Sequence, residues 1–140
     1  MTALSIAIWG VGGLTWPLWK RWVNEIEQFG FAGHYFIDAL PHGLQVYTDS
    51  LETMVALTYL ADHTERVQLG TVVALMPVRN PVMFVRQAVA LDDLSGGRFV
   101  LGLGAGGGQA REARMFGYDF GDVVTRMARL EEGLEVITRL

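Results

Sequence analysis

The sequence contains no cysteine and only three histidines. Without cysteine, the chain can form no disulfide, no thiolate metal site and no thiol nucleophile, and three scattered histidines disfavour a transition-metal site built from protein ligands alone. Basic residues are also few: the net charge is -4, and no basic cluster is longer than Lys20-Arg21. We therefore expect neither nucleic acid nor an anionic membrane as a partner.

Long apolar runs and a charged leader are also lacking. No segment reaches the roughly 18 to 20 uninterrupted apolar residues of a membrane span. The apolar N-terminus carries no basic residue before Lys20, so it lacks the charged start of a signal peptide. We expect a cytoplasmic protein. The chain is 51% hydrophobic and 19% charged, which is the balance of a packed soluble domain that can bury a core.

Apolar periodicity and glycine or proline punctuation divide the chain into four strand-helix units. Strands are predicted at residues 4–9, 33–39, 66–75 and 98–104, and helices at 18–30, 50–64, 82–94, 109–117 and 122–140. Ser50 is the candidate N-cap of its helix, Pro81 is expected in the first turn of the third helix, and Gly30 and Gly96-Gly97 are candidate helix ends. The apolar stripe of the last helix predicts ordinary core packing. Its members are Val123, Met127, Leu130, Leu134 and Ile137.

Repeated strand-helix units indicate a parallel α/β sheet, because parallel neighbours need crossover helices and those crossovers are right-handed. The sheet is either open and doubly wound or part of a closed barrel. Four units in 140 residues leave 35 per unit, and eight such units would approach the ~250 residues of a (β/α)8 barrel. The chain also ends inside a helical pattern. We therefore expect half of a TIM-type barrel, with strand order 1-2-3-4 and no switch point.

A glycine cluster, "RFVLGLGAGGG" at residues 98–108, closes the fourth predicted strand. Gly102, Gly104 and Gly107 match the dinucleotide pattern G-x-G-x-x-G. The dinucleotide-binding fold also needs a second strand that ends in an acidic residue about 20 residues after the glycines, and no such strand is predicted here. An S-adenosylmethionine-dependent methyltransferase is a weaker alternative, because Gly102 stands where its first motif carries an acid. If no ligand binds, the glycines would serve only to let a helix approach the end of a strand. Because glycine destabilises regular elements, five glycines within seven positions favour a ligand that approaches the bare backbone.

The segment "TERVQLGTVVALMPVRNPVMFVRQAVALDDLSGGRFVLGLGAG", followed by "MFG", closely resembles the luciferase-like monooxygenase superfamily of flavin- and deazaflavin-dependent (β/α)8 barrels. The most specific pieces are "LGT", the loop at 77–81, "LDDLSGGRF" and "GLGAG". The resemblance runs over residues 4–140 and covers about the first half of the family's barrel. It implies one domain over residues 1–140, incomplete at its C-terminus, and a role for FMN or coenzyme F420.

The resemblance also implies where the cofactor lies. The ring would rest at the carboxyl ends of the strands, where the third strand bulges through a non-prolyl cis peptide between Val72 and Val73. The small residues Gly104, Ala105 and Gly106 would keep the floor open beneath the ring or the substrate.

Two positions depart from the family's pattern. Many relatives carry an acid followed by a catalytic histidine after the second strand, and here the pair is Asp38-Ala39. Asp38 is therefore a candidate catalytic and cofactor-binding residue, and His42, in the same loop, is a candidate substitute for the base. Gly107 stands where relatives that oxidise sugar phosphates carry an acid, so that substrate class is disfavoured.

We therefore expect a luciferase-like oxidoreductase acting on a small organic substrate, either by monooxygenation with FMN or by hydride transfer with F420. A flavin reductase is a candidate partner, and the full-length form is expected to be a homodimer. The alternative is an incomplete, non-catalytic half-barrel that needs a partner or a missing C-terminal half, because the outer edges of its sheet would be left unpaired.

Overall fold

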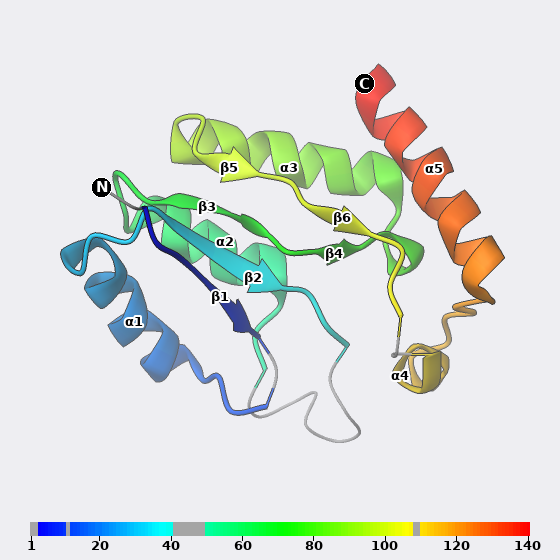
Figure 1. Ribbon diagram of the computed structural model, residues 1–140, viewed down its shortest axis with the longest axis horizontal. Coiled ribbons are helices and arrows are strands. Elements are labelled where there is room, and N and C mark those ends of the chain that lie inside the picture. Colours follow the sequence, from blue (N-terminus) through cyan, green and yellow to red (C-terminus); the bar gives the residue numbers. More distant parts are fainter. Residues whose placement is uncertain (1–2, 11, 41–49, 108–109) are drawn as a thin grey trace.

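The structure, a computed structural model, describes residues 3–10, 12–40, 50–107 and 110–140. Its main sheet has four parallel strands: β1 (Ser5–Trp9), β2 (Gly33–Ile37), β3 (Gln68–Thr71) and β5 (Phe99–Val100). They lie side by side in the order β1-β2-β3-β5 (Figure 1). The order follows the chain without reversal, which confirms the predicted order and contradicts a doubly wound nucleotide-binding sheet.

Within the described ranges, five α-helices follow the strands: α1 (Trp16–Gln28), α2 (Thr53–Asp62), α3 (Pro81–Ser95), α4 (Ala110–Met115) and α5 (Val123–Arg139). Figure 1 shows α2 and α3 together behind the sheet. The core joins Trp19 of α1 and Leu57 of α2 to Phe84 of α3 and Phe36 of β2. The three helices thus pack against one face of the sheet. Among the described residues, none of the helices is long and apolar enough to cross a bilayer.

The two faces of the sheet differ in exposure because strand side chains alternate. Ile6, Phe36 and Leu69 lie on the helix-covered face and belong to the core or pack against it. Trp9 and Val100 lie on the opposite face and are exposed. In a closed barrel this second face would be the interior. The arrangement is that of a partial barrel, as predicted.

The third and fourth predicted strands are each divided in two: the bulge that the family resemblance implies in the third is confirmed, whereas the prediction of a continuous fourth strand is wrong. After β3 the chain steps aside at residues 72–73 and resumes as β4 (Ala74–Leu75), and β5 is followed by β6 (Leu103–Gly104). β4 and β6 pair in parallel as a separate two-stranded sheet. The short 3-10 helix η2 (Met76–Val78) follows β4.

Helix ends agree with the sequence at three points and differ at one. Gly30 and Gly96 adopt left-handed backbone conformations just after α1 and α3, and Pro81 opens α3. The prediction of Ser50 as an N-cap is wrong: the side chain of Glu52 accepts the N–H of Val55 at 2.9 Å instead. The acid takes this role because it stands directly before the first helical residue.

The predicted apolar stripe of α5 is only partly in the core. Leu130 and Ile137 pack against the core, whereas Val123 and Met127 are exposed. The buried residue of α5 is Gly133, where an added Cβ would lie 2.8 Å from Cε of Met76. The helix therefore approaches η2 through a glycine, and the outer part of the stripe is left uncovered within the described chain.

Candidate functional site

The site begins at the bulge between β3 and β4. The peptide bond between Val72 and Val73 is cis, which confirms the geometry that the family resemblance implies. The N–H of Val72 still donates to the carbonyl of Phe36 at 2.8 Å, and the strand then leaves β2. Val72 and Val73 are 48% and 37% exposed as whole residues. Two branched apolar side chains thus remain accessible at the carboxyl end of the sheet.

The glycine segment of the fourth strand runs beside this bulge. Leu75 pairs with Gly104, and a Cβ added to Gly104 would lie 2.3 Å from Cγ2 of Val73. We call Val72, Val73, Gly104, Ala105 and Gly106 the shelf. The structure thus brings these five predicted cofactor-binding residues into two adjacent segments of chain.

Contacts within the chain account for part of the glycine pattern. A Cβ on Gly102 would lie 2.1 Å from the carbonyl oxygen of Thr71, and Gly106 combines a φ of +69° with the nearby ring of Phe120. Gly107, by contrast, has nothing within 4 Å of an added Cβ. Close packing of the two split strands therefore requires some of these glycines whether or not a ligand is bound.

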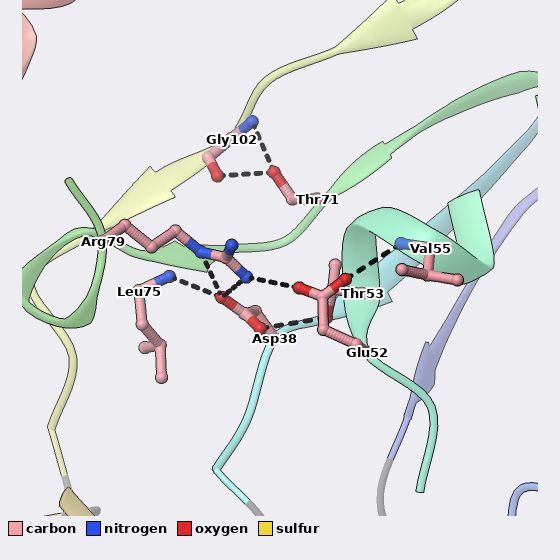
Figure 2. A network of polar contacts seen from close by, with 8 residues as sticks. All are labelled: Asp38, Glu52, Thr53, Val55, Thr71, Leu75, Arg79 and Gly102. Atoms are coloured by element: carbon pink, nitrogen blue, oxygen red, sulfur yellow. Dashed lines mark hydrogen bonds and ion pairs between the residues drawn. The ribbon is translucent and has the colours of Figure 1, made fainter. Parts of the chain in front are cut away.

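Thr71 and Gly102 connect the two split strands. The hydroxyl of Thr71 donates to the carbonyl of Gly102 at 2.7 Å and accepts the N–H of the same residue at 3.0 Å (Figure 2). A side chain thus continues the connection between the strands where the pairing of β3 with β5 has ended. This contact holds the fourth strand against the bulge.

Asp38 follows β2 and lies under the bulge, with its carboxylate fully engaged. One oxygen, Oδ1, accepts the hydroxyl of Thr53 at 2.9 Å. The other, Oδ2, accepts the N–H of Leu75 at 3.0 Å and two guanidinium N–H groups of Arg79 at 3.1 and 2.8 Å (Figure 2). The Asp38 side chain is 9% exposed. It joins the end of β2 to the first turn of α2, to β4 and to the residue after η2.

Arg79 is the cation of this network and lies between two carboxylates. Its Nη2 also donates to Oε1 of Glu52 at 3.2 Å, and its guanidinium lies 4.7 Å from the centre of the Phe84 ring. Burial opposes the charge, but Asp38 and Glu52 outweigh burial and raise the pKa of Arg79 above its ordinary value. Arg79 and Glu52 were not among the residues predicted from the sequence. The available signal was a lone arginine in an otherwise uncharged loop after the third strand.

A cavity of about 570 Å³ opens beside this network. Its walls come from the ends of β2 and η2, the start of α2, and the segment after α4. They include Asp38, Glu52, Arg79, Phe116 and Tyr118. The predicted base His42 lies outside the described residues. Within the described part of the chain, no three histidine, aspartate or glutamate side chains are grouped to hold a metal ion.

Comparisons with known proteins agree with this geometry. Limonene 1,2-monooxygenase of Rhodococcus erythropolis is 32% identical over 119 residues, which are 84% of this chain and 29% of that protein. The F420-dependent glucose-6-phosphate dehydrogenase of Kineococcus radiotolerans is 36% identical over 117 residues, 83% of this chain and 34% of that one. The chain thus spans about a third of the length of these relatives.

Solved structures show the same fold. The oxygenating constituent of 3,6-diketocamphane monooxygenase from Pseudomonas putida, solved in complex with FMN, superposes with a TM-score of 0.76 at 15% identity. The match covers 96% of this chain and 38% of that one. The family model described as luciferase-like monooxygenase matches residues 10–140. The chain therefore belongs to the luciferase-like monooxygenase family.

Proposed function

We propose that the protein is an oxidoreductase that uses FMN or coenzyme F420 to act on a small organic molecule. The observation that carries the proposal is the shelf, where exposed Val72 and Val73 lie beside the glycine-rich segment from Gly104 to Gly106. The shelf lies at the carboxyl end of the parallel strands, where (β/α)8 barrels hold their active sites. Relatives named as F420-dependent enzymes and a neighbour solved with FMN support both cofactors.

The chemistry of the shelf fits a flat aromatic ring. Its side chains are short and apolar, and it contains no charged group. The side chains of Val73 and Phe120 lie where a Cβ of Gly104 or Gly106 would stand, so the glycines let apolar side chains pack against the main chain of the shelf. When bound, the cofactor supplies the redox chemistry. The residues of this chain then hold the ring in position and limit the access of water.

The cavity beside the shelf is our proposed substrate pocket. Phe116 and Tyr118 offer aromatic surface, whereas Asp38, Glu52 and Arg79 together leave one uncompensated negative charge. This charge disfavours an anionic substrate such as a sugar phosphate. The glycine at position 107 supports the same conclusion. We therefore propose an uncharged small organic substrate.

We also propose two partners. The full-length form is a homodimer, for which the exposed Val82 and Val89 on the outer side of α3 offer apolar contact surface. If FMN is the cofactor, a separate flavin reductase supplies it in reduced form. Light scattering on the purified protein tests the dimer, and dependence of turnover on an added reductase tests the second partner.

Titration with FMN and with F420 tests the proposed function, in protein expressed from its complete reading frame. Ring fluorescence should change saturably with one of the two. Val72→Asp places a carboxylate on the shelf and should weaken binding about tenfold or more, because a charge that meets an apolar ring loses hydration. Val124→Asp makes the same change at an exposed valine of α5 that we place in no site, and it should leave affinity unchanged. Binding of neither cofactor contradicts the proposal.

A further inference from the structure

The bulge leaves a backbone donor that the sheet does not satisfy. β2 pairs with β3 only as far as Phe36 and Thr71, and beyond that point β4 pairs with β6 alone. The N–H of Leu75 therefore points toward the end of β2 without a strand partner there. Backbone N–H groups that are buried need an acceptor. Oδ2 of Asp38 is that acceptor, at 3.0 Å.

The carboxylate of Asp38 replaces a strand carbonyl, and its charge is compensated locally. Arg79 donates two hydrogen bonds to the same oxygen, and Thr53 donates to the other one. A general base must accept a proton from the substrate. If Asp38 did so, its side chain, which is 9% exposed, would lose the charge that pairs with Arg79, and Arg79 would keep only Glu52 as an ionic partner. These contacts favour a role in positioning over a role in proton transfer.

We propose that Asp38 and Arg79 form a clamp that positions the shelf. Asp38 holds Leu75, Leu75 pairs with Gly104, and Val73 lies against Gly104. A shift of β4 would thus displace both segments of the shelf at once. The cofactor-related part of this inference rests on the proposed function. The mechanical part, that Asp38 and Arg79 fix β4, does not.

Amide hydrogen exchange tests the mechanical part without any cofactor. In the unmodified protein the Leu75 amide should exchange slowly. Asp38→Asn and Arg79→Gln should each speed its exchange about tenfold or more, because each removes half of the charge pair and frees the strand. Arg86→Gln makes the same change at an exposed arginine of α3 and should leave the Leu75 rate unchanged. Unchanged Leu75 exchange in both clamp variants would overturn the clamp.

Cofactor affinity and the pH dependence of turnover separate a clamp from a base. A clamp predicts that Asp38→Asn and Arg79→Gln weaken FMN or F420 binding by similar factors, about tenfold or more, and that the double variant is no worse than either single one. The pH profile of kcat should keep its shape in both. Loss of one limb of that profile in Asp38→Asn alone, with cofactor affinity intact, would identify Asp38 as the base and overturn the proposal.

Milder variants keep the proposal testable if the first ones fold poorly. Arg79→Lys retains the charge but loses the two-pronged contact, and should give intermediate Leu75 exchange and intermediate cofactor affinity. Thr53→Val removes only the contact to Oδ1 and should have a smaller effect than Arg79→Lys. The reverse order of these two effects would contradict the clamp. If the unmodified protein binds neither cofactor while the exchange results hold, only the proposed function fails.

Discussion

Protonation of His34 should make the fold sensitive to acid. The ring is fully buried between Trp19 and Phe36, with ring centres 5.1 and 6.1 Å away, and neither ring nitrogen has a hydrogen-bond partner in the described part of the chain. Burial lowers the pKa of His34 from 6.5 to about 4. The unfolded chain therefore binds a proton at a higher pH than the folded protein does.

The sign and the size of the effect follow from this difference. Above pH 6.5 His34 is neutral in the folded and the unfolded state, and it does not lower the free energy of unfolding. As the pH falls from 6.5 toward 4, the unfolded state gains a proton that the folded state lacks. The free energy of unfolding should fall by about 3 kcal/mol when the pH is well below 4, and by about 2 kcal/mol between pH 7 and pH 4.5.

Urea denaturation followed by tryptophan fluorescence at pH 7 and pH 4.5 measures this loss. His34→Leu removes the proton site but keeps an apolar side chain in the core, so its loss between the two pH values should be smaller by about 2 kcal/mol. His63→Gln, at a histidine near the end of α2 that is 39% exposed, is the control and should retain the full loss. Equal losses in the unmodified protein and in His34→Leu would refute the reasoning.

Three further predictions concern the framework. Gly102→Ala should lower the free energy of unfolding by about 1–3 kcal/mol, because its Cβ would meet the carbonyl of Thr71. Gly107→Ala should leave the free energy of unfolding unchanged, because its Cβ would enter open space. Thermal melts of the two variants measure the difference. Arg98→Lys should lower the free energy of unfolding by about 2–4 kcal/mol, because an ammonium cannot replace the geometry of the guanidinium. The guanidinium donates hydrogen bonds to four residues, Ala61, Thr64, Val67 and Ser95. A urea midpoint equal to that of the unmodified protein would contradict this prediction. Burial alone would raise the pKa of Glu27, but the N–H groups of residues 65–67 donate to its carboxylate and lower the pKa below 4.5. The stability that this group contributes should therefore be present above pH 4.5 and be lost as the pH falls through the lowered value. Glu27→Gln should flatten that part of the pH profile in urea melts.

The strand order and the main helices could be predicted because they follow from local patterns. Apolar periodicity locates the units, and parallel crossover rules place them side by side. Gly30, Pro81 and Gly96 marked helix ends because their backbone preferences act at a single position. The cis peptide at residues 72–73 was implied by the family resemblance and not by residue patterning.

The division of the fourth strand could not be predicted from residue patterning, and the bulge of the third strand was implied by the family resemblance alone. The break depends on side chains distant in sequence: Asp38 meets Leu75 across 37 positions, and Thr71 meets Gly102 across 31. The positioning role that we propose for Asp38 could not be predicted for the same reason. A carboxylate at a strand end is typical of a reactive residue. The contact of Asp38 with Arg79, which forms only in the folded chain, instead favours a positioning role.

A crystal structure of the protein with FMN or F420 bound tests the central claim most directly. We predict a tricyclic ring on the open side of the sheet, within about 4 Å of Val72 and Val73 and of the main chain from Gly104 to Gly106. A ring bound away from these residues, or a side chain of the same polypeptide covering them in the cofactor complex, would contradict it.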